Sequence, residues 1–184
     1  MKRIFDIITS IISIILLTPF ALLIALIIAL ESHGGVFFTQ DRGGINGGAF
    51  KIFKFRTMIP GAENKGPLLA VRGDSRVTRF GRLLRRWSLD ELPQLFNIIK
   101  GDMSLVGPRP EILPIVKNYT EWQRKVLLVK PGLSGFSQVM GRDDLSIETK
   151  LRLDIYYIRH HSFCFDMWII WKTVVIVLTG KGAF

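Results

Sequence analysis

The chain has 184 residues, of which 48% are hydrophobic, and its 25 Lys and Arg against 15 Asp and Glu give a net charge of +10. This length suits one ordinary domain and is too short for two well-packed domains once an apolar N-terminal segment is set aside. Only +1 of the charge comes from residues 1–6, so a surplus of +9 on the remainder favours nucleic acid, anionic lipid headgroups or phosphorylated small molecules as partners. The single cysteine, Cys164, excludes an internal disulfide framework and favours a reducing, cytosolic setting.

The N-terminal segment is apolar, with 24 consecutive uncharged residues from position 7 to position 30. As a straight helix it would cover roughly 36 Å, enough to cross a bilayer core. A cleavable signal peptide fits poorly, because its apolar stretch is usually about 7–15 residues long and no Ala-x-Ala site precedes Glu31. We therefore expect a membrane unit over residues 1–31 and a cytosolic, membrane-associated domain over residues 32–184.

Thr18 and Pro19 interrupt the middle of this segment. Pro19 has no N–H for the carbonyl of Ile15 and its ring crowds that carbonyl, so a bend is expected there, while the Thr18 hydroxyl can satisfy freed backbone groups. Spanning helices and re-entrant helices both tolerate such a bend. The cationic residues before the segment and the basic domain after it slightly favour a re-entrant helix with both ends cytoplasmic.

The next residues, 35–58, predict a β-hairpin with strands at 36–39 and 50–55. The glycines between the strands fit a turn better than a phosphate-binding loop, since no Gly-Lys-Ser/Thr follows them. A polar loop is expected over residues 59–75. Helical patterns then run over residues 76–87, 89–99, 112–129 and 146–157, with turns at 107–110 and 132–141. We predict an α+β fold, a mostly helical small domain with a short β-hairpin.

A second apolar stretch covers residues 163–178 and contains Asp166, Trp168, Trp171 and Lys172. Its amphipathic, aromatic character is typical of a helix that lies in the membrane interface. A core helix of the soluble domain is an equally good interpretation.

Arginines are concentrated between positions 72 and 86. Three-residue steps predict that four of them share one broad helical face, which could be a solvated stripe or could rest on acidic headgroups. Arg85, nearest to an acidic pair, is the candidate ligand for a substrate phosphate, because a guanidinium can form two parallel hydrogen bonds to it. The six arginines are Arg72, Arg76, Arg79, Arg82, Arg85 and Arg86.

The acidic pair, Asp90 and Glu91, follows this arginine-rich segment. Ser88 and Glu91 have the spacing of a capping box at a helix start, so a structural role for both is possible. Backbone amides and the positive helix end would then favour ionised Asp90. Such a carboxylate can hold Mg²⁺ or attack phosphorus.

Further candidates follow later in the chain. Arg109 stands between Pro108 and Pro110, where restricted backbone freedom lowers the ordering cost of a polar contact, although an exposed loop arginine is an equally good interpretation. Gln138 and Arg142 flank Gly141, and for each of them a ligand role and an exposed loop position are equally good interpretations.

Four ordered motifs resemble those of the monotopic phosphoglycosyl transferases, also called bacterial sugar transferases. The first is a Lys-rich strand motif, Lys-Ile-Phe-Lys-Phe-Arg-Thr-Met at residues 51–58, and the second is Arg-x-x-Ser-Leu-Asp-Glu-Leu-Pro-Gln at residues 85–94. Residues 97–110 and 130–135 are similar again, and the resemblance covers nearly the whole chain. Met140 departs from it, because many members have asparagine just before the Gly-Arg pair.

This resemblance implies transfer of a sugar 1-phosphate from a UDP-sugar to a polyprenyl phosphate such as undecaprenyl phosphate, with release of UMP, as the first step of glycoconjugate assembly. Asp90 would be the nucleophile and would also hold Mg²⁺, with Glu91 as a base or as an organiser of the metal site. The substrate-binding candidates are Arg85, Arg109, Gln138 and Arg142.

The resemblance also implies a re-entrant helix hairpin bent at Thr18-Pro19, and a location on the cytoplasmic face of the bacterial inner membrane. Without further spanning helices, the chain would be a minimal catalytic form. A membrane-anchored basic protein that binds nucleic acid or anionic lipid without catalysis is the alternative. No nucleic-acid reading motif accompanies the arginines, so no nucleic-acid partner is expected. The sequence does not specify the sugar or the oligomeric state.

Overall fold

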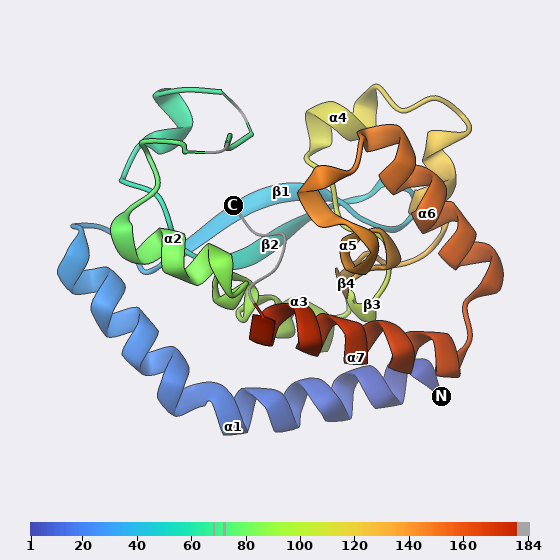
Figure 1. Cartoon of the computed structure of the whole chain (residues 1–184), viewed down its shortest axis with the longest axis horizontal. Coiled ribbons are helices and arrows are strands. Elements are labelled where there is room, and N and C mark those ends of the chain that lie inside the picture. The colour runs from blue at the N-terminus through green and yellow to red at the C-terminus, as the bar shows by residue number, and fades with distance from the viewer. Residues whose placement is uncertain (68, 72, 180–184) are drawn as a thin grey trace.

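The computed structural model describes residues 1–67, 69–71 and 73–179 and consists of one long N-terminal helix beneath a small mixed body (Figure 1). Arg72, one of the six clustered arginines, lies outside the described residues. The elements in chain order are α1 (Lys2–Glu31), β1 (Phe37–Gly43), β2 (Ala49–Phe55), α2 (Arg79–Arg86), α3 (Gln94–Lys100), β3 (Ser104–Val106), α4 (Leu113–Lys117), β4 (Gly132–Ser134), α5 (Phe136–Met140), α6 (Ile147–His160) and α7 (Phe163–Thr179).

Helix α1 is long and apolar enough to cross a membrane by length and composition. It continues through Pro19, and the Thr18 hydroxyl donates a hydrogen bond to the carbonyl of Ile14 at 2.6 Å. Figure 1 shows that the helix axis changes direction along its length, as expected for a proline within a helix. The structure therefore contains one bent helix in place of two separate helical arms.

Both ends of α1 are fastened to the body. Near the start, the Arg3 guanidinium donates to the carbonyl of Ile99 at 2.8 Å, and the buried Asp6 carboxylate accepts from the Ser104 hydroxyl at 2.8 Å. At the other end, the Glu31 carboxylate accepts from the amide of Phe80 at 2.9 Å. The charged residues at the start of α1 therefore bind the body directly, in addition to their effect on the orientation of α1 in a membrane.

The predicted hairpin is confirmed. Strands β1 and β2 pair antiparallel from Phe37 opposite Phe55 to Gly43 opposite Ala49, so β1 is longer than expected. A 3₁₀ turn at Ile45–Gly47 joins them. A second sheet was not predicted: β3 and β4 form a parallel pair, with Ser104 opposite Gly132. Its strands have three residues each, too few to produce an alternating pattern.

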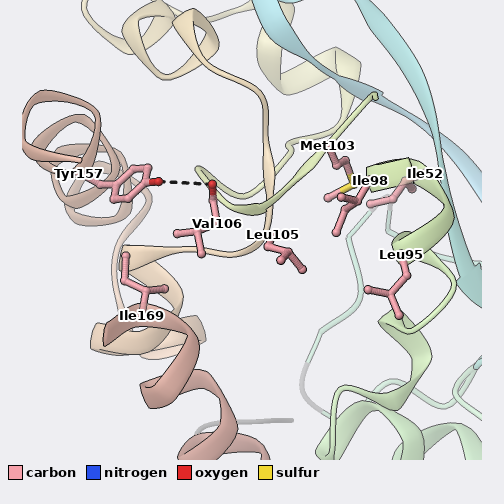
Figure 2. Close-up of a cluster of buried hydrophobic side chains, with 8 residues drawn as sticks. All are labelled: Ile52, Leu95, Ile98, Met103, Leu105, Val106, Tyr157 and Ile169. Atoms are coloured by element: carbon pink, nitrogen blue, oxygen red, sulfur yellow. Dashed lines mark hydrogen bonds between the residues drawn. The ribbon is translucent and has the colours of Figure 1, made fainter. Parts of the chain in front are cut away.

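The main core lies where the hairpin, α3, β3, α6 and α7 meet, and Figure 2 shows its eight buried residues. They are Ile52, Leu95, Ile98, Met103, Leu105, Val106, Tyr157 and Ile169. Helix α7 contributes Ile169, which is fully buried, while Trp171 and Leu178 on the same helix are exposed. The two interpretations of residues 163–178 therefore each hold for one face of α7. Its inner face packs in the core, and its outer face is apolar and exposed.

Three of the predicted helices differ from the structure. The helix predicted over residues 76–87 begins only at Arg79, because Arg76 is buried and binds the Asp74 carboxylate and the carbonyl of Ala62. Arg76 therefore does not belong to a shared helical face. The helix predicted over residues 89–99 is a 3₁₀ turn at Leu89–Glu91 followed by α3.

The helix predicted over residues 112–129 is also divided, into α4 and a 3₁₀ helix at Gln123–Leu128. The Thr120 and Gln123 side chains exchange hydrogen bonds with each other's amides, which is a capping box and starts the second segment anew. By contrast, α6 is confirmed, with the Ser146 hydroxyl accepting from the amide of Thr149.

Gly81 allows α2 to approach the hairpin closely. A Cβ at this position would lie 2.2 Å from the carbonyl oxygen of Thr57. We predict that Gly81→Ala destabilises the protein by about 1–3 kcal/mol, because the helix must move away from a backbone atom. Thermal unfolding of the detergent-solubilised protein measures this effect. Gly35→Ala is the matched control, since its nearest contact would be 3.7 Å away, and an equal melting temperature for the two variants would contradict the prediction.

Candidate active site

Asp90 lies in the 3₁₀ turn Leu89–Glu91 between α2 and α3 and is only 7% exposed. The preceding Ser88 has a left-handed backbone, with φ of 53°. The predicted capping box is therefore wrong, because a capping residue needs an extended backbone and Ser88 makes no capping hydrogen bond. The Ser88 hydroxyl instead accepts a hydrogen bond from the Arg142 guanidinium.

Lys54 of β2 links both carboxylates of the pair. Its ammonium lies 2.6 Å from Glu91 Oε1 and 3.8 Å from Asp90 Oδ2. Lys54 is not among the predicted site residues. Lys54 lies in the strand motif at residues 51–58, and that motif is the sequence feature that could have identified it as a site residue. A lysine next to a carboxylate stabilises the ionised form of that carboxylate.

Arg109 approaches Glu91 from the solvent side. Its guanidinium lies 2.9 Å from Glu91 Oε1, and its side chain is 44% exposed. The segment that carries it is held to the hairpin, since the amide of Gly43 donates to the carbonyl of Glu111 at 2.9 Å and Arg42 donates to the carbonyl of Pro110 at 3.1 Å. Long-range backbone contacts thus fix Arg109 in addition to the two flanking prolines.

The two carboxyl groups have opposite pKa shifts. Burial raises the pKa of Asp90, and Lys54 only partly offsets this. Burial also acts to raise the pKa of Glu91, but the nearby Arg109 and Lys54 more than compensate and hold the pKa of that carboxyl well below its usual range. The expectation that a helix end favours ionised Asp90 differs from this result: Asp90 lies in a three-residue turn, and burial, which raises its pKa, is the largest influence on it.

The other candidate ligands lie at different distances from this turn. Arg85 stands in the last turn of α2, where its Nε donates to the Thr57 hydroxyl at 2.9 Å and the charge of Asp90 acts on it. Arg142 contacts Ser88. Gln138 lies on α5, and within the described residues its buried Oε1 has no hydrogen-bond partner. The structure therefore brings Arg85, Arg109 and Arg142 to the Ser88–Glu91 turn, whereas in the described part of the chain no hydrogen bond joins the Gln138 side chain to that turn.

Asp90 and Glu91 are the residues of this turn that could hold a magnesium ion together with a substrate. No group of three or more His, Cys, Asp or Glu in the described ranges could hold a metal ion. Mg²⁺, however, is commonly bound by one or two carboxylates together with waters and substrate phosphates, so a pair such as Asp90 and Glu91 has the right chemistry. With Lys54, Arg85 and Arg109 close by, the site suits a ligand that carries several negative charges.

Lys54 should contribute to stability as a partner of buried charge. We predict that Lys54→Met lowers the free energy of unfolding by about 1–3 kcal/mol, because the Glu91 carboxylate loses a charged hydrogen-bond donor. Thermal or denaturant unfolding in detergent measures this loss. Lys65→Met removes an exposed lysine as the control, and an equally small effect of both substitutions would contradict the prediction.

Comparisons with known proteins show similarity over nearly the whole chain. A family model described as "Bacterial sugar transferase" matches residues 1–180. The chain is 43% identical over 190 residues to a UDP-N-acetylgalactosamine-undecaprenyl-phosphate N-acetylgalactosaminephosphotransferase of Aeromonas hydrophila, covering 99% of this chain and 44% of that protein. The chain thus spans less than half the length of that relative.

Two other relatives are covered more fully. One is the uncharacterized sugar transferase EpsL of Bacillus subtilis, 41% identical over 99% of this chain and 89% of its own length. The other is a UDP-glucose:undecaprenyl-phosphate glucose-1-phosphate transferase of Caulobacter vibrioides, 40% identical over 100% of this chain and 72% of its own length.

Proposed function

Because the chain belongs to the bacterial sugar transferase family, we propose that it transfers a sugar 1-phosphate from a UDP-sugar to a polyprenyl phosphate and releases UMP. The names of the Aeromonas and Caulobacter relatives supply the substrate classes, a UDP-sugar and undecaprenyl phosphate. The observation that carries the proposal is a buried carboxylate, Asp90, with Lys54 beside it and arginines nearby. Phosphoryl transfer depends mainly on alignment and on neutralisation of charge, which this arrangement provides.

The reaction proceeds in two displacements at one phosphorus. An Asp90 carboxylate oxygen attacks the phosphorus that bears the sugar, the bond from that phosphorus to the bridging oxygen breaks, and UMP leaves with the bond electrons. An oxygen of the polyprenyl phosphate then attacks the same phosphorus, and the Asp90 carboxylate is restored. The product is a polyprenyl diphosphate sugar.

Each neighbour of Asp90 has a distinct role in this scheme. Lys54 favours the ionised form of Asp90, and Arg85 and Arg109 bind the diphosphate oxygens. Because its pKa is held low, Glu91 is a weak base, so it serves to hold Lys54 and Arg109 in place and to order the metal site. Mg²⁺ bound by Asp90, with Glu91 nearby, would neutralise charge on the diphosphate.

Helix α1 is proposed to be re-entrant, with both ends on the cytoplasmic side of the bacterial inner membrane. Its 30 residues measure about 45 Å if straight, yet Arg3 and Glu31 both contact the same body. A body on one side of a bilayer cannot hold both ends of a helix that crosses the bilayer. The outward apolar side chains of α1, among them Ile15, Leu22 and Leu26, would then lie in lipid.

The first test is release of UMP from a panel of UDP-sugars with undecaprenyl phosphate in detergent or vesicles. We expect release by the wild type with Mg²⁺, none after chelation by EDTA, and a loss of at least about 1,000-fold in Asp90→Asn, since an amide cannot act as the nucleophile. Asp41→Asn, an exposed aspartate, is the control. Substantial activity in Asp90→Asn would refute its assignment, and lipid binding without UMP release would favour a non-catalytic scaffold.

The acid limb of the pH profile should report Asp90. Activity requires the carboxylate, so kcat/KM falls as the pH drops through the raised pKa of Asp90. Lys54→Met removes a charge that lowers this pKa, so the midpoint of the limb should move to higher pH, while Lys54→Arg should leave it close to the wild-type position. An acid limb that does not move in Lys54→Met would contradict this role.

Topology can be read from cysteine labelling in a Cys164→Ser background. Cysteines placed at Lys2 and at Ser32 should react with an impermeant maleimide from the same, cytoplasmic side of the membrane. Labelling of the two positions from opposite sides would mean that α1 spans the bilayer.

A further inference from the structure

Arg85 is held through one edge of its guanidinium only. Its Nε donates to the Thr57 hydroxyl at 2.9 Å, and this is its one hydrogen bond to the described residues. A guanidinium is planar, so a bond at Nε sets the direction of both terminal nitrogens as well. The free edge, which carries Nη1 and Nη2, is the one that can bind a phosphate through two parallel hydrogen bonds.

Thr57 is itself rigidly placed. It is buried, and its carbonyl accepts from the amide of Thr78 at 3.0 Å, one residue before α2 begins. Gly81 in the first turn of α2 packs directly against the same carbonyl. As a β-branched residue, Thr57 also has restricted rotation about χ1. The hydroxyl that receives Arg85 therefore belongs to the junction of the hairpin with α2 and has little freedom to move.

The orientation of Arg85 matters because the charge of Asp90 acts on its guanidinium. Burial lowers the pKa of Arg85, and the negative charge of Asp90 is the largest influence that opposes this, so the two groups are close enough to interact. Within the described residues, no hydrogen bond joins the Arg85 terminal nitrogens to Asp90 or to Glu91. The nitrogens are thus available to a ligand beside the carboxylate.

We propose that Thr57 is a positioning residue, whose hydroxyl orients the Arg85 guanidinium so that both terminal nitrogens bind the phosphate that Asp90 attacks. This inference rests on the proposed function. Without the hydroxyl, the Arg85 side chain keeps its charge and loses its fixed orientation. Binding of the diphosphate would then require ordering of the side chain each time a substrate arrives.

The test compares Thr57→Val, which has nearly the same shape without the hydroxyl, with Thr57→Ser, which keeps it. The dissociation constant of UDP with Mg²⁺ is measured by titration, and kcat and KM are measured for the UDP-sugar. We expect Thr57→Val to weaken UDP binding and to lower kcat/KM by about tenfold to 100-fold. Thr57→Ser should remain within about threefold of the wild type, with both variants melting within about 3 °C of it.

A double-mutant cycle tests whether Thr57→Val acts through Arg85. In an Arg85→Ala background, Thr57→Val should cause less than about a twofold further change, because the residue that it orients is absent. Independent, multiplicative losses would overturn the inference, as would wild-type UDP affinity and KM in Thr57→Val or a Thr57→Ser variant as weak as Thr57→Val. UDP binding by a wild type that releases no UMP would refute the proposed function but still test the role of Thr57. A wild type that binds no UDP would overturn both.

Discussion

The burial of one carboxylate among fixed cations is the constraint on which the site depends. Asp90 is removed from water in a short turn, and this burial raises its pKa and so favours the protonated form. Lys54 opposes that tendency from the hairpin, and Glu91 keeps Lys54 and Arg109 together through the hydrogen bonds that it accepts. The packing of the hairpin, the turn and the Arg109 segment therefore determines how far the ionised form of Asp90, the proposed nucleophile, is stabilised.

The same packing relates the site to the lipid acceptor. Helix α1 is bound at its first turns through Arg3 and Asp6 and at its end through Glu31, so its bend points away from the body (Figure 1). The outer face of α7 adds exposed tryptophans, which favour the interface between lipid and water. In the proposed topology these elements would hold Asp90 near the depth at which a polyprenyl phosphate presents its phosphate.

Local patterns in the sequence predicted part of the local structure. The hairpin, α6 and the apolar helices α1 and α7 all follow from periodicity or turn residues. The parallel pair of β3 and β4 depends on backbone pairing between distant segments, such as Ser104 opposite Gly132, and Arg76 is held by the carbonyl of Ala62, 14 positions earlier. No short pattern encodes either contact. Lys54 and Thr57 were missed as site residues for a similar reason, since each acts on a partner at least 28 positions away. The left-handed backbone of Ser88 excludes the predicted capping box, although the residue spacing fits one.

The most direct test of the central claim is the detection of a covalent intermediate. Enzyme incubated with a UDP-sugar and Mg²⁺ in the absence of polyprenyl phosphate, then quenched and digested, should carry a sugar-phosphate adduct when analysed by mass spectrometry. The account predicts that fragmentation locates this adduct on Asp90. An adduct on another side chain, or UMP release that occurs only with the acceptor present and leaves no adduct, would contradict it.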